Sequence, residues 1–476
     1  MPESLKSKTI KGVLWSGIER FSVQGVQFLV LLIIANILDP KDFGLIGMLT
    51  IFLAVGQSLI DSGFSQALIR KQDRTDLDNN TVFYFNIVVS VLLYLLLCFI
   101  APWIAIFYEE PQLTDLMRVL SVVVVINSFA VVQRAIYTAS IDFKTQAKAS
   151  FIGALISGIV GVSMAMNGYG VWTLVWQQII NACINTGLLW IYSSWFPKLQ
   201  YSWISFRSLF SFGSKLLASG LLDTVYTNMY SLVIGKVFSA ASLGHYTQAD
   251  RFAKLPSSNI TGILQRVTYP VLCSIQNDEE RLRGDYRQLL RLSAFVIFPL
   301  MCLLAGIAYP LVEVLIGEKW HFAATLIIPL SFHMMWWPIH AINLNLLQVK
   351  GRSDLFLKLE IIKKTIGVIV LIVSVPLGLL FMCYCSIATS IINLVINTYY
   401  TGKLIDVGFI VQMKDLSKTL ITSLLMYAFV YASTLIFDNN IMKVFVGIAI
   451  GILCYVGVVK TFRFNELSYL KSIVKR

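Results

Sequence analysis

Long apolar segments recur along almost the whole chain, separated by short polar connections. A helix needs about 20 predominantly apolar residues to cross a bilayer, and by that measure the pattern predicts about fourteen transmembrane helices. The expected spans are 12–37, 43–66, 80–104, 114–138, 148–167, 170–193, 209–236, 242–273, 287–315, 322–349, 356–376, 379–401, 417–437 and 442–461. The fold class is therefore predicted to be all-α, with an even number of crossings that places both termini on one side of the membrane.

Basic residues provide an independent check of this count, because the cytoplasmic loops of membrane proteins are enriched in Lys and Arg. The connections on the side of the N-terminus are basic throughout, from Lys6 and Lys8 to Lys471. The opposite connections offer only Lys41, Lys236, Lys319 and Lys443. This alternation predicts that both termini are cytoplasmic.

The composition agrees with a membrane protein. Hydrophobic residues make up 57% of the chain and charged residues 13%, and the mean hydropathy is +0.74. A soluble domain with this balance would not stay in solution. The formal net charge of +12 comes largely from the loops, so it indicates orientation in the membrane rather than binding to nucleic acid.

A turn pattern occurs twice, 200 residues apart. Residues 37–44 read ILDPKDFG, residues 237–244 read VFSAASLG, and each is followed by a helix with polar positions. If the repeat reflects two parallel halves of six helices, these would form a central cleft suited to alternating access. The alternative is that the repeated pattern is a chance match between apolar segments. The predicted organisation is a six-helix lobe in 1–200, a second six-helix lobe in 201–405, and two additional helices with a basic tail in 406–476.

Charged residues within the spans are the candidates for function, because each costs roughly 2.5–3.5 kcal/mol at the bilayer centre and normally faces a polar cavity or a partner. The segment 242–273 contains Arg251 and Lys254 as near neighbours on a helix, with Arg266 four turns deeper. This cationic track suits an anionic substrate, since arginine binds phosphate oxygens in a bidentate manner. Pairing of these cations with acids such as Asp250 is the alternative.

The acids Asp61, Glu19 and Asp223 also lie within spans. A buried carboxyl group has a raised pKa and can change its charge as a cavity opens and closes. The three acids are therefore candidates for coupling transport to H⁺ or Na⁺. Neutralisation by an arginine from another helix is the competing interpretation.

No metal or cofactor site is expected. The seven cysteines lie in or beside apolar segments, without the spacing of a disulfide or zinc framework. His333 and His340 would share one helix face, but nothing nearby in the sequence supplies further ligands. The connections opposite the cytoplasm are short, the longest being 107–113, which leaves no room for an external catalytic domain and argues against an enzyme.

Four short motifs have a familiar form: LDPKDFG at 38–44, DSGFSQALIR at 61–70, YTQADRFAKLP at 246–256 and GEKW at 317–320. They resemble the motifs of Wzx-type polysaccharide flippases, in the branch that exports colanic-acid and teichuronic-acid type repeat units. These proteins belong to the multidrug, oligosaccharidyl-lipid and polysaccharide exporter superfamily. The resemblance covers nearly the whole chain and is specific to the family, but not to a substrate.

The resemblance implies a protein of the bacterial inner membrane that moves an undecaprenyl-diphosphate-linked oligosaccharide from the cytoplasmic to the periplasmic leaflet, for synthesis of lipopolysaccharide, capsule or exopolysaccharide. It also implies that no covalent bond is made or broken. A polysaccharide polymerase and glycosyltransferases would be the protein's partners. Basic cavity residues of the family are thought to hold the diphosphate or acidic sugars. The candidates for that role here are Arg251, Lys254, Arg266, Arg134 and Lys215. Of these, Lys215 lies near a cytoplasmic helix end, where it could instead extend toward the head groups.

Two other functions remain open from the sequence. A drug or metabolite antiporter of the same superfamily, driven by H⁺ or Na⁺, would favour acidic residues for binding organic cations, and the excess of Arg and Lys in 242–273 argues against it. A membrane glycosyltransferase or polymerase would need a catalytic carboxylate or arginine on an external loop. The charged residues available there are Glu109, Glu110, Asp115, Glu318 and Lys319.

Overall fold

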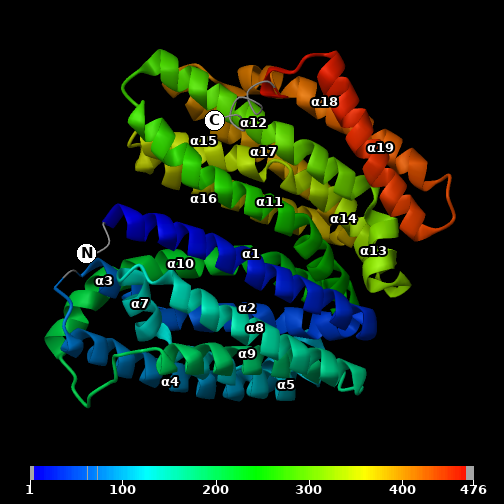
Figure 1. Ribbon diagram of the computed structural model, residues 1–476. Helices are drawn as coiled ribbons and strands as arrows, with labels where there is room; N and C mark the ends of the chain where they lie inside the picture. Colours follow the sequence, from blue (N-terminus) through cyan, green and yellow to red (C-terminus); the bar gives the residue numbers. More distant parts are fainter. Residues whose placement is uncertain (1–4, 62, 72, 468–476) are drawn as a thin grey trace. The chain divides into compact units, whose positions relative to one another are not determined.

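The computed structural model describes residues 5–61, 63–71 and 73–467, and this part of the chain is predominantly helical with no strand (Figure 1). The chain divides into two compact units, which we call unit 1 (Met1–Gly244) and unit 2 (His245–Arg476). The boundary falls in the first turns of a long helix, so that helix begins in unit 1 and continues through unit 2.

Unit 1 is built from ten helices and the start of an eleventh within the described residues. They are α1 (Leu5–Ile37), α2 (Pro40–Asp61), α3 (Phe64–Arg70), α4 (Asp76–Tyr108), α5 (Leu113–Leu120), α6 (Val122–Ser128), α7 (Val131–Ala139), α8 (Phe143–Met166), α9 (Trp172–Ile191), α10 (Trp203–Val237) and the beginning of α11 (Ala240–Ser274). Helix α8 packs against both α1 and α9, and α2 packs against α10 and α4.

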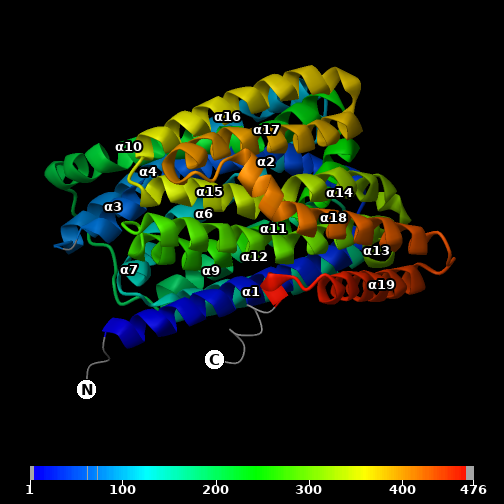
Figure 2. The ribbon, with the colours of Figure 1, turned by 90° about the horizontal axis from the view of Figure 1, so that it is seen from above.

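Unit 2 contains the rest of α11 and the remaining helices. They are α12 (Glu279–Gly306), α13 (Ala308–Ile316), the 3₁₀ helix η1 (Glu318–Trp320), α14 (His321–Met334), α15 (Trp337–Val349), α16 (Ser353–Ser374), the 3₁₀ helix η2 (Val375–Leu377), α17 (Leu379–Ile405), α18 (Phe409–Thr434) and α19 (Asn440–Thr461). Helix α18 lies beside α12, and α19 lies beside α18 and α13 (Figure 2). Helix α17 packs against α14, α15 and α16.

Several helices begin at a polar side chain that accepts a hydrogen bond from the first turn. Thr75 and Asp78 form a reciprocal capping box at the start of α4. Asp142 caps α8, Ser202 caps α10 and Asp278 caps α12. These caps satisfy backbone N–H groups that have no partner within the helix, so short polar connections are enough to define where the long helices start.

Every expected span falls on a helix or on consecutive short helices. The fourth span is divided into α5, α6 and α7, and the tenth into α14 and α15. Among the described residues, nine helical segments are long and apolar enough to cross a membrane by themselves. The all-α membrane fold is thus confirmed, while the count of fourteen crossings stays a prediction.

The first compact unit extends to Gly244 because α10 packs against α2 and α4 of the same unit. The three-part division at residues 200 and 405 stays a prediction.

The distribution of side chains is that of a protein surrounded by lipid. Large apolar side chains point outward, with Ile106 72%, Phe445 70% and Leu453 72% exposed. Polar side chains such as Asn86 and Gln133 are fully buried. Extended apolar surfaces of this kind are rare on soluble monomers, so the structure agrees with a multi-pass membrane protein.

The repeated turn occupies equivalent places in the structure. Helix α1 ends at Ile37 and α2 begins at Pro40, while α10 ends at Val237 and α11 begins at Ala240. The two turns also pack against each other inside unit 1. A Cβ atom on Gly44 would lie 1.6 Å from the carbonyl oxygen of Ala240, and one on Gly244 would lie 1.8 Å from that of Pro40. Only glycine allows two backbones to approach this closely.

Candidate functional site

Arg134 on α7 is held in unit 1 by a carboxamide. Its Nη2 donates to Oδ1 of Asn185 on α9 at 3.2 Å, and Nδ2 of Asn185 donates to Oγ of Ser150 on α8 at 3.2 Å. Within the described part of the chain, the Arg134 guanidinium makes no further hydrogen bond. Since a guanidinium has five N–H donors, most of them remain open to water or to an anion.

Asp61 ends α2 and receives its own series of hydrogen bonds. Nδ2 of Asn127 on α6 donates to Oε1 of Gln57 at 3.0 Å, and Nε2 of Gln57 donates to Oδ1 of Asp61 at 3.4 Å. The exposed Asp61 carboxylate also interacts electrostatically with Arg134. No direct ion pair joins these two side chains among the described residues. The structure thus places a predicted substrate-binding cation and a predicted ion-coupling acid within electrostatic range of each other.

In unit 2, the predicted cationic track lies on α11. Lys254 Nζ is 3.6 Å from Oδ2 of Asp250, one helical turn away. Arg251 and Arg266 are exposed, and neither makes a hydrogen bond or ion pair with any other described residue. An electrostatic interaction with Asp250 does reach Arg251. Lys254 is therefore paired with an acid of its own helix, as the alternative interpretation expected. The guanidinium N–H groups of the two arginines are not used by such a pair.

Two histidines lie within the polar interior of unit 2. His333 Nδ1 is 2.8 Å from the carbonyl oxygen of Ser386, and His340 Nε2 is 3.0 Å from Oγ of Ser390. His340 Nδ1 is also 3.3 Å from Nδ2 of Asn397. The two histidines lie on consecutive helices, α14 and α15, and both face α17. No cluster of three metal-binding side chains occurs in the part of the chain that the structure describes.

The other predicted site residues are less informative. The side chains of Glu19 and Lys215 lie outside the described residues. Asp223 is exposed on α10 and is engaged with a neighbouring group. Their roles in substrate binding or ion coupling stay predictions.

Residues that the sequence interpretation did not single out are Asn185, Asn127 and Ser150. Each is a neutral polar residue in an apolar helix, which is a weak signal because such residues are also tolerated as local helix hydrogen bonders. Their importance depends on which charged side chain lies opposite them. That information is not present in the local sequence.

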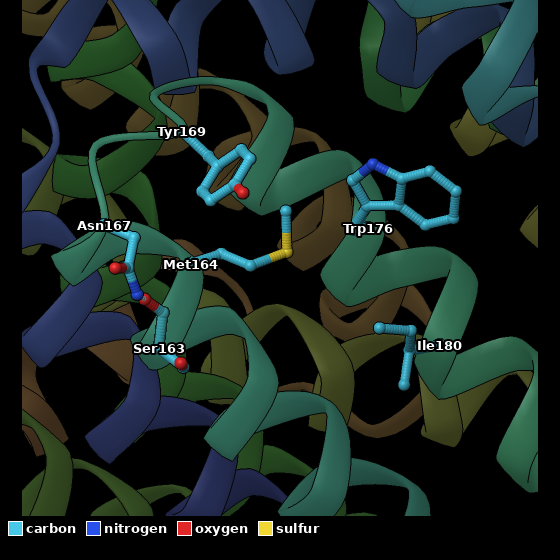
Figure 3. Close-up of a pocket in the computed structure, with 6 residues that line it drawn as sticks. All are labelled: Ser163, Met164, Asn167, Tyr169, Trp176 and Ile180. Atoms are coloured by element: carbon cyan, nitrogen blue, oxygen red, sulfur yellow. Dashed lines mark hydrogen bonds between the residues drawn. The ribbon is translucent and has the colours of Figure 1, made fainter.

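A separate pocket lies between the end of α8 and the start of α9 (Figure 3). Its cavity volume is about 470 Å³, and its lining residues are Ser163, Met164, Asn167, Tyr169, Trp176 and Ile180. Asn167 donates from Nδ2 to the carbonyl oxygen of Ser163 at 2.7 Å, as Figure 3 shows. The residues that line it include no charged side chain.

Comparison with known proteins identifies a family and agrees with the all-helical fold. Residues 33–325 match the family described as Polysaccharide biosynthesis protein. The teichuronic acid biosynthesis protein TuaB of Bacillus subtilis (strain 168) is 24% identical, over 95% of each chain. The lipopolysaccharide biosynthesis protein WzxC of Escherichia coli (strain K12) is also 24% identical, over 76% of this chain and 74% of its own.

Among solved structures, the lipid II flippase MurJ in an inward closed conformation has the same fold. The TM-score is 0.77, with 15% identity over 94% of this chain and 98% of the other. The resemblance derived from the sequence motifs is confirmed by the family match. The chain therefore belongs to the polysaccharide biosynthesis protein family, as a Wzx-type flippase of the multidrug, oligosaccharidyl-lipid and polysaccharide exporter superfamily, and is a transporter rather than an enzyme.

Proposed function

We propose that this chain moves an oligosaccharide linked to a polyprenyl diphosphate, such as undecaprenyl diphosphate, from the cytoplasmic to the outer leaflet of the bacterial inner membrane. The family and the relatives TuaB and WzxC support a polysaccharide precursor as cargo. The polyprenyl tail can remain in the lipid, because it is as apolar as the bilayer itself. The charged and hydroxylated head group needs a polar passage, because the hydrocarbon core offers it no hydrogen bonds.

The observation that carries this proposal is the pair of exposed arginines on α11. Arg251 and Arg266 have no hydrogen-bonding or ion-pair partner among the described residues. Fifteen positions separate them, which corresponds to about 22 Å along a helix. A guanidinium without a hydrogen-bonding partner is costly in a membrane helix, and a diphosphate would supply oxygen acceptors for it. The two arginines would bind it at successive depths during its passage.

Orientation and partners form part of the same proposal. The alternation of basic loops supports cytoplasmic termini, so the cargo would be loaded from the leaflet where nucleotide-activated sugars are available. Glycosyltransferases would supply the lipid-linked unit, and a polymerase on the opposite side would consume it. Coupling to H⁺ or Na⁺ through Asp61, Glu19 or Asp223 is compatible with this scheme.

A deletion strain complemented with variants tests the proposal. Arg251→Ala combined with Arg266→Ala should lower surface glycan at least about ten-fold and cause lipid-linked repeat units to accumulate, since the loss of two charge-assisted contacts is worth more than 1.4 kcal/mol. Arg281→Ala, which removes an exposed arginine next to Asp285, serves as the matched control. The measurements are immunoblotting of membrane protein, surface glycan and sugars released by mild acid from extracted lipids.

Normal glycan in the double variant at equal protein level would exclude the role of these arginines. Intact glycan in the deletion strain, accompanied by altered drug sensitivity, would instead favour the antiporter. In vitro elongation of a glycan by the purified chain would be needed to support a polymerase.

A further inference from the structure

The pocket between the end of α8 and the start of α9 has no part in the proposed passage of the diphosphate. It belongs entirely to unit 1 and has a volume of about 470 Å³. The alternation of basic loops predicts that the connection between these two helices lies opposite the cytoplasm. That is the side to which the proposed cargo is delivered, so the pocket is placed to contact the cargo there.

Two glycines shape the connection that carries Tyr169. Gly168 and Gly170 have positive φ angles of 79° and 54°, in a backbone region that glycine enters readily because it has no Cβ atom. Between them, the Tyr169 N–H donates to the carbonyl oxygen of Met164 at 3.3 Å. The connection therefore folds back onto the last turn of α8, and Tyr169 lines the same cavity as Met164 (Figure 3).

Two aromatic rings and two aliphatic side chains form the apolar part of the pocket. Trp176 is 43% exposed and Tyr169 is 57% exposed, and both line the cavity together with Met164 and Ile180. Neither ring packs against another aromatic ring or a cation among the described residues. The face of an aromatic ring carries partial negative charge, so it attracts the weakly positive C–H groups on one face of a sugar ring.

The polar part of the pocket consists of neutral groups with free hydrogen-bonding capacity. Asn167 donates from Nδ2 to the carbonyl oxygen of Ser163 at 2.7 Å, and this bond leaves Oδ1 as an acceptor. The hydroxyl groups of Ser163 and Tyr169 and the indole N–H of Trp176 have no hydrogen-bonding partner in the part of the chain that the structure describes. A set of this kind offers both donors and acceptors, which matches sugar hydroxyl groups because each of them can donate and accept.

Anchoring in the membrane interface is the other common role of tryptophan and tyrosine near the ends of membrane helices. Anchoring would account for the two rings alone. It does not require that an amide oxygen and a serine hydroxyl border the same cavity as the rings. The combination of ring faces, neutral polar groups and a shared cavity is instead typical of a site for a small polar molecule.

We propose that this pocket binds a neutral sugar ring of the lipid-linked oligosaccharide on the outer side of the membrane. Trp176 provides the stacking face, and Asn167 binds a sugar hydroxyl group. The inference rests on the proposed function and assigns a contact to the glycan, whereas Arg251 and Arg266 are assigned to the diphosphate. The volume lies within the range of about 300–1,000 Å³ that is usual for small-molecule sites.

The test measures equilibrium binding of sugars to the purified full-length chain in a detergent without a sugar head group. The probes are the methyl glycosides of glucose, galactose and N-acetylglucosamine, titrated and followed by saturation-transfer difference NMR. We expect at least one of them to bind. A separate titration with glycerophosphocholine, which presents a phospholipid head group without acyl chains, distinguishes a sugar site from a lipid site.

Trp176→Leu should weaken sugar binding at least about five-fold, because it removes the stacking face. Trp176→Phe keeps a ring and should retain most of the affinity. Asn167→Ala should weaken binding about two- to ten-fold through the loss of one hydrogen bond. The matched control is Trp103→Leu, which removes a tryptophan of unit 1 that is 55% exposed on α4 and lies outside the pocket.

The melting temperature of each variant separates misfolding from a loss of binding. Absence of binding for all three glycosides would overturn the inference, as would full affinity in a folded Trp176→Leu variant. Binding of glycerophosphocholine alone, lost in Trp176→Leu, would make the pocket a phospholipid site and overturn it as well. Because no transport is measured, these outcomes are independent of the export test. Intact surface glycan in the deletion strain would contradict the proposed function and the assignment to the cargo, while sugar binding that depends on Trp176 would still support the site itself.

Discussion

Gln412 lies at the centre of a buried hydrogen-bond network in unit 2. Its Nε2 is 3.0 Å from Oδ1 of Asn343, 3.2 Å from Oγ1 of Thr401 and 3.3 Å from the hydroxyl of Tyr286. Its Oε1 accepts from Nδ2 of Asn343 at 3.1 Å. These residues come from α12, α15, α17 and α18 and are at most 1% exposed. A satisfied network of this kind defines one arrangement of the four helices, because any shift would leave polar groups unpaired.

Replacing Gln412 with Met tests this network at nearly constant volume. We expect a loss of about 2–4 kcal/mol in stability, because Tyr286, Asn343 and Thr401 would stay buried with fewer partners. Thermal unfolding in detergent, followed by fluorescence-detected size exclusion, measures the effect as a lower melting temperature. Gln276→Met, at an exposed position in the same unit, should leave it unchanged. Equal melting temperatures for both variants would contradict a structural role of the network.

At the scale of whole helices, glycines determine how α2 and α10 pack. The helices run antiparallel: Gly44 in α2 lies near Ala240 just beyond the end of α10, and Gly63 just beyond the end of α2 lies near Gly213 in α10. Gly63 has a positive φ of 67°, and a Cβ atom there would lie 2.5 Å from the carbonyl oxygen of Gly213. Close backbone contact at both ends keeps the two helices in a fixed register.

Gly44→Ala and Gly244→Ala should each destabilise the protein by at least about 1–3 kcal/mol, because the added methyl group would overlap a backbone carbonyl that cannot rotate away. Gly187→Ala is the matched control, since Gly187 is also helical but has nothing within 4 Å of a Cβ atom. That change should be neutral or stabilising by up to about 1 kcal/mol. Melting temperatures in detergent distinguish the two cases. A stable Gly44→Ala variant would show that the turns can separate without cost.

For the molecule as a whole, ion pairs join α12 to the last helices within unit 2. Arg287 on α12 binds Asp415 on α18 through two hydrogen bonds of 2.7 Å. Arg291, one turn further along α12, lies 3.5 Å from Glu466 beyond α19. These contacts fall near the loops that the positive-inside rule predicts to be cytoplasmic. Unit 2 therefore combines an apolar outer surface with a charged end on that predicted side.

The orientation can be tested with single cysteines in a background whose seven native cysteines are replaced by alanine. Gln112→Cys and Asn277→Cys both introduce an exposed thiol into a connection. A membrane-impermeant maleimide added to intact cells with a permeable outer membrane should label Cys only at position 112, because the positive-inside rule places position 277 in the cytoplasm. Disruption of the inner membrane should expose both. The reverse labelling pattern would contradict the predicted topology.

The sequence was sufficient for the positions of the helices and for the family. The apolar segments predicted a helix at every place where the structure has one or a consecutive series, and the paired turns predicted that α1 and α10 end 200 residues apart. The sequence was less informative about where a helix is interrupted within one predicted span, as between α14 and α15. The apolar pattern continues through these interruptions and therefore does not reveal them. The sequence singled out Arg134 and Asp61 as charged residues within membrane spans. It assigned them to separate roles, Arg134 to substrate binding and Asp61 to ion coupling.

Helix position is a local property, since the length of an apolar segment and the capping residue at its start decide where a membrane helix forms. The sequence by itself therefore determined the all-α membrane architecture, the alternation of basic loops and the cationic face of α11. Only the tertiary structure decided that Asn185 holds Arg134, that Asp61 lies within its electrostatic reach, and that Gly44 and Gly244 are in backbone contact. These relations join residues 51, 73 and 200 positions apart, and such distances are bridged only by the packing of helices against one another.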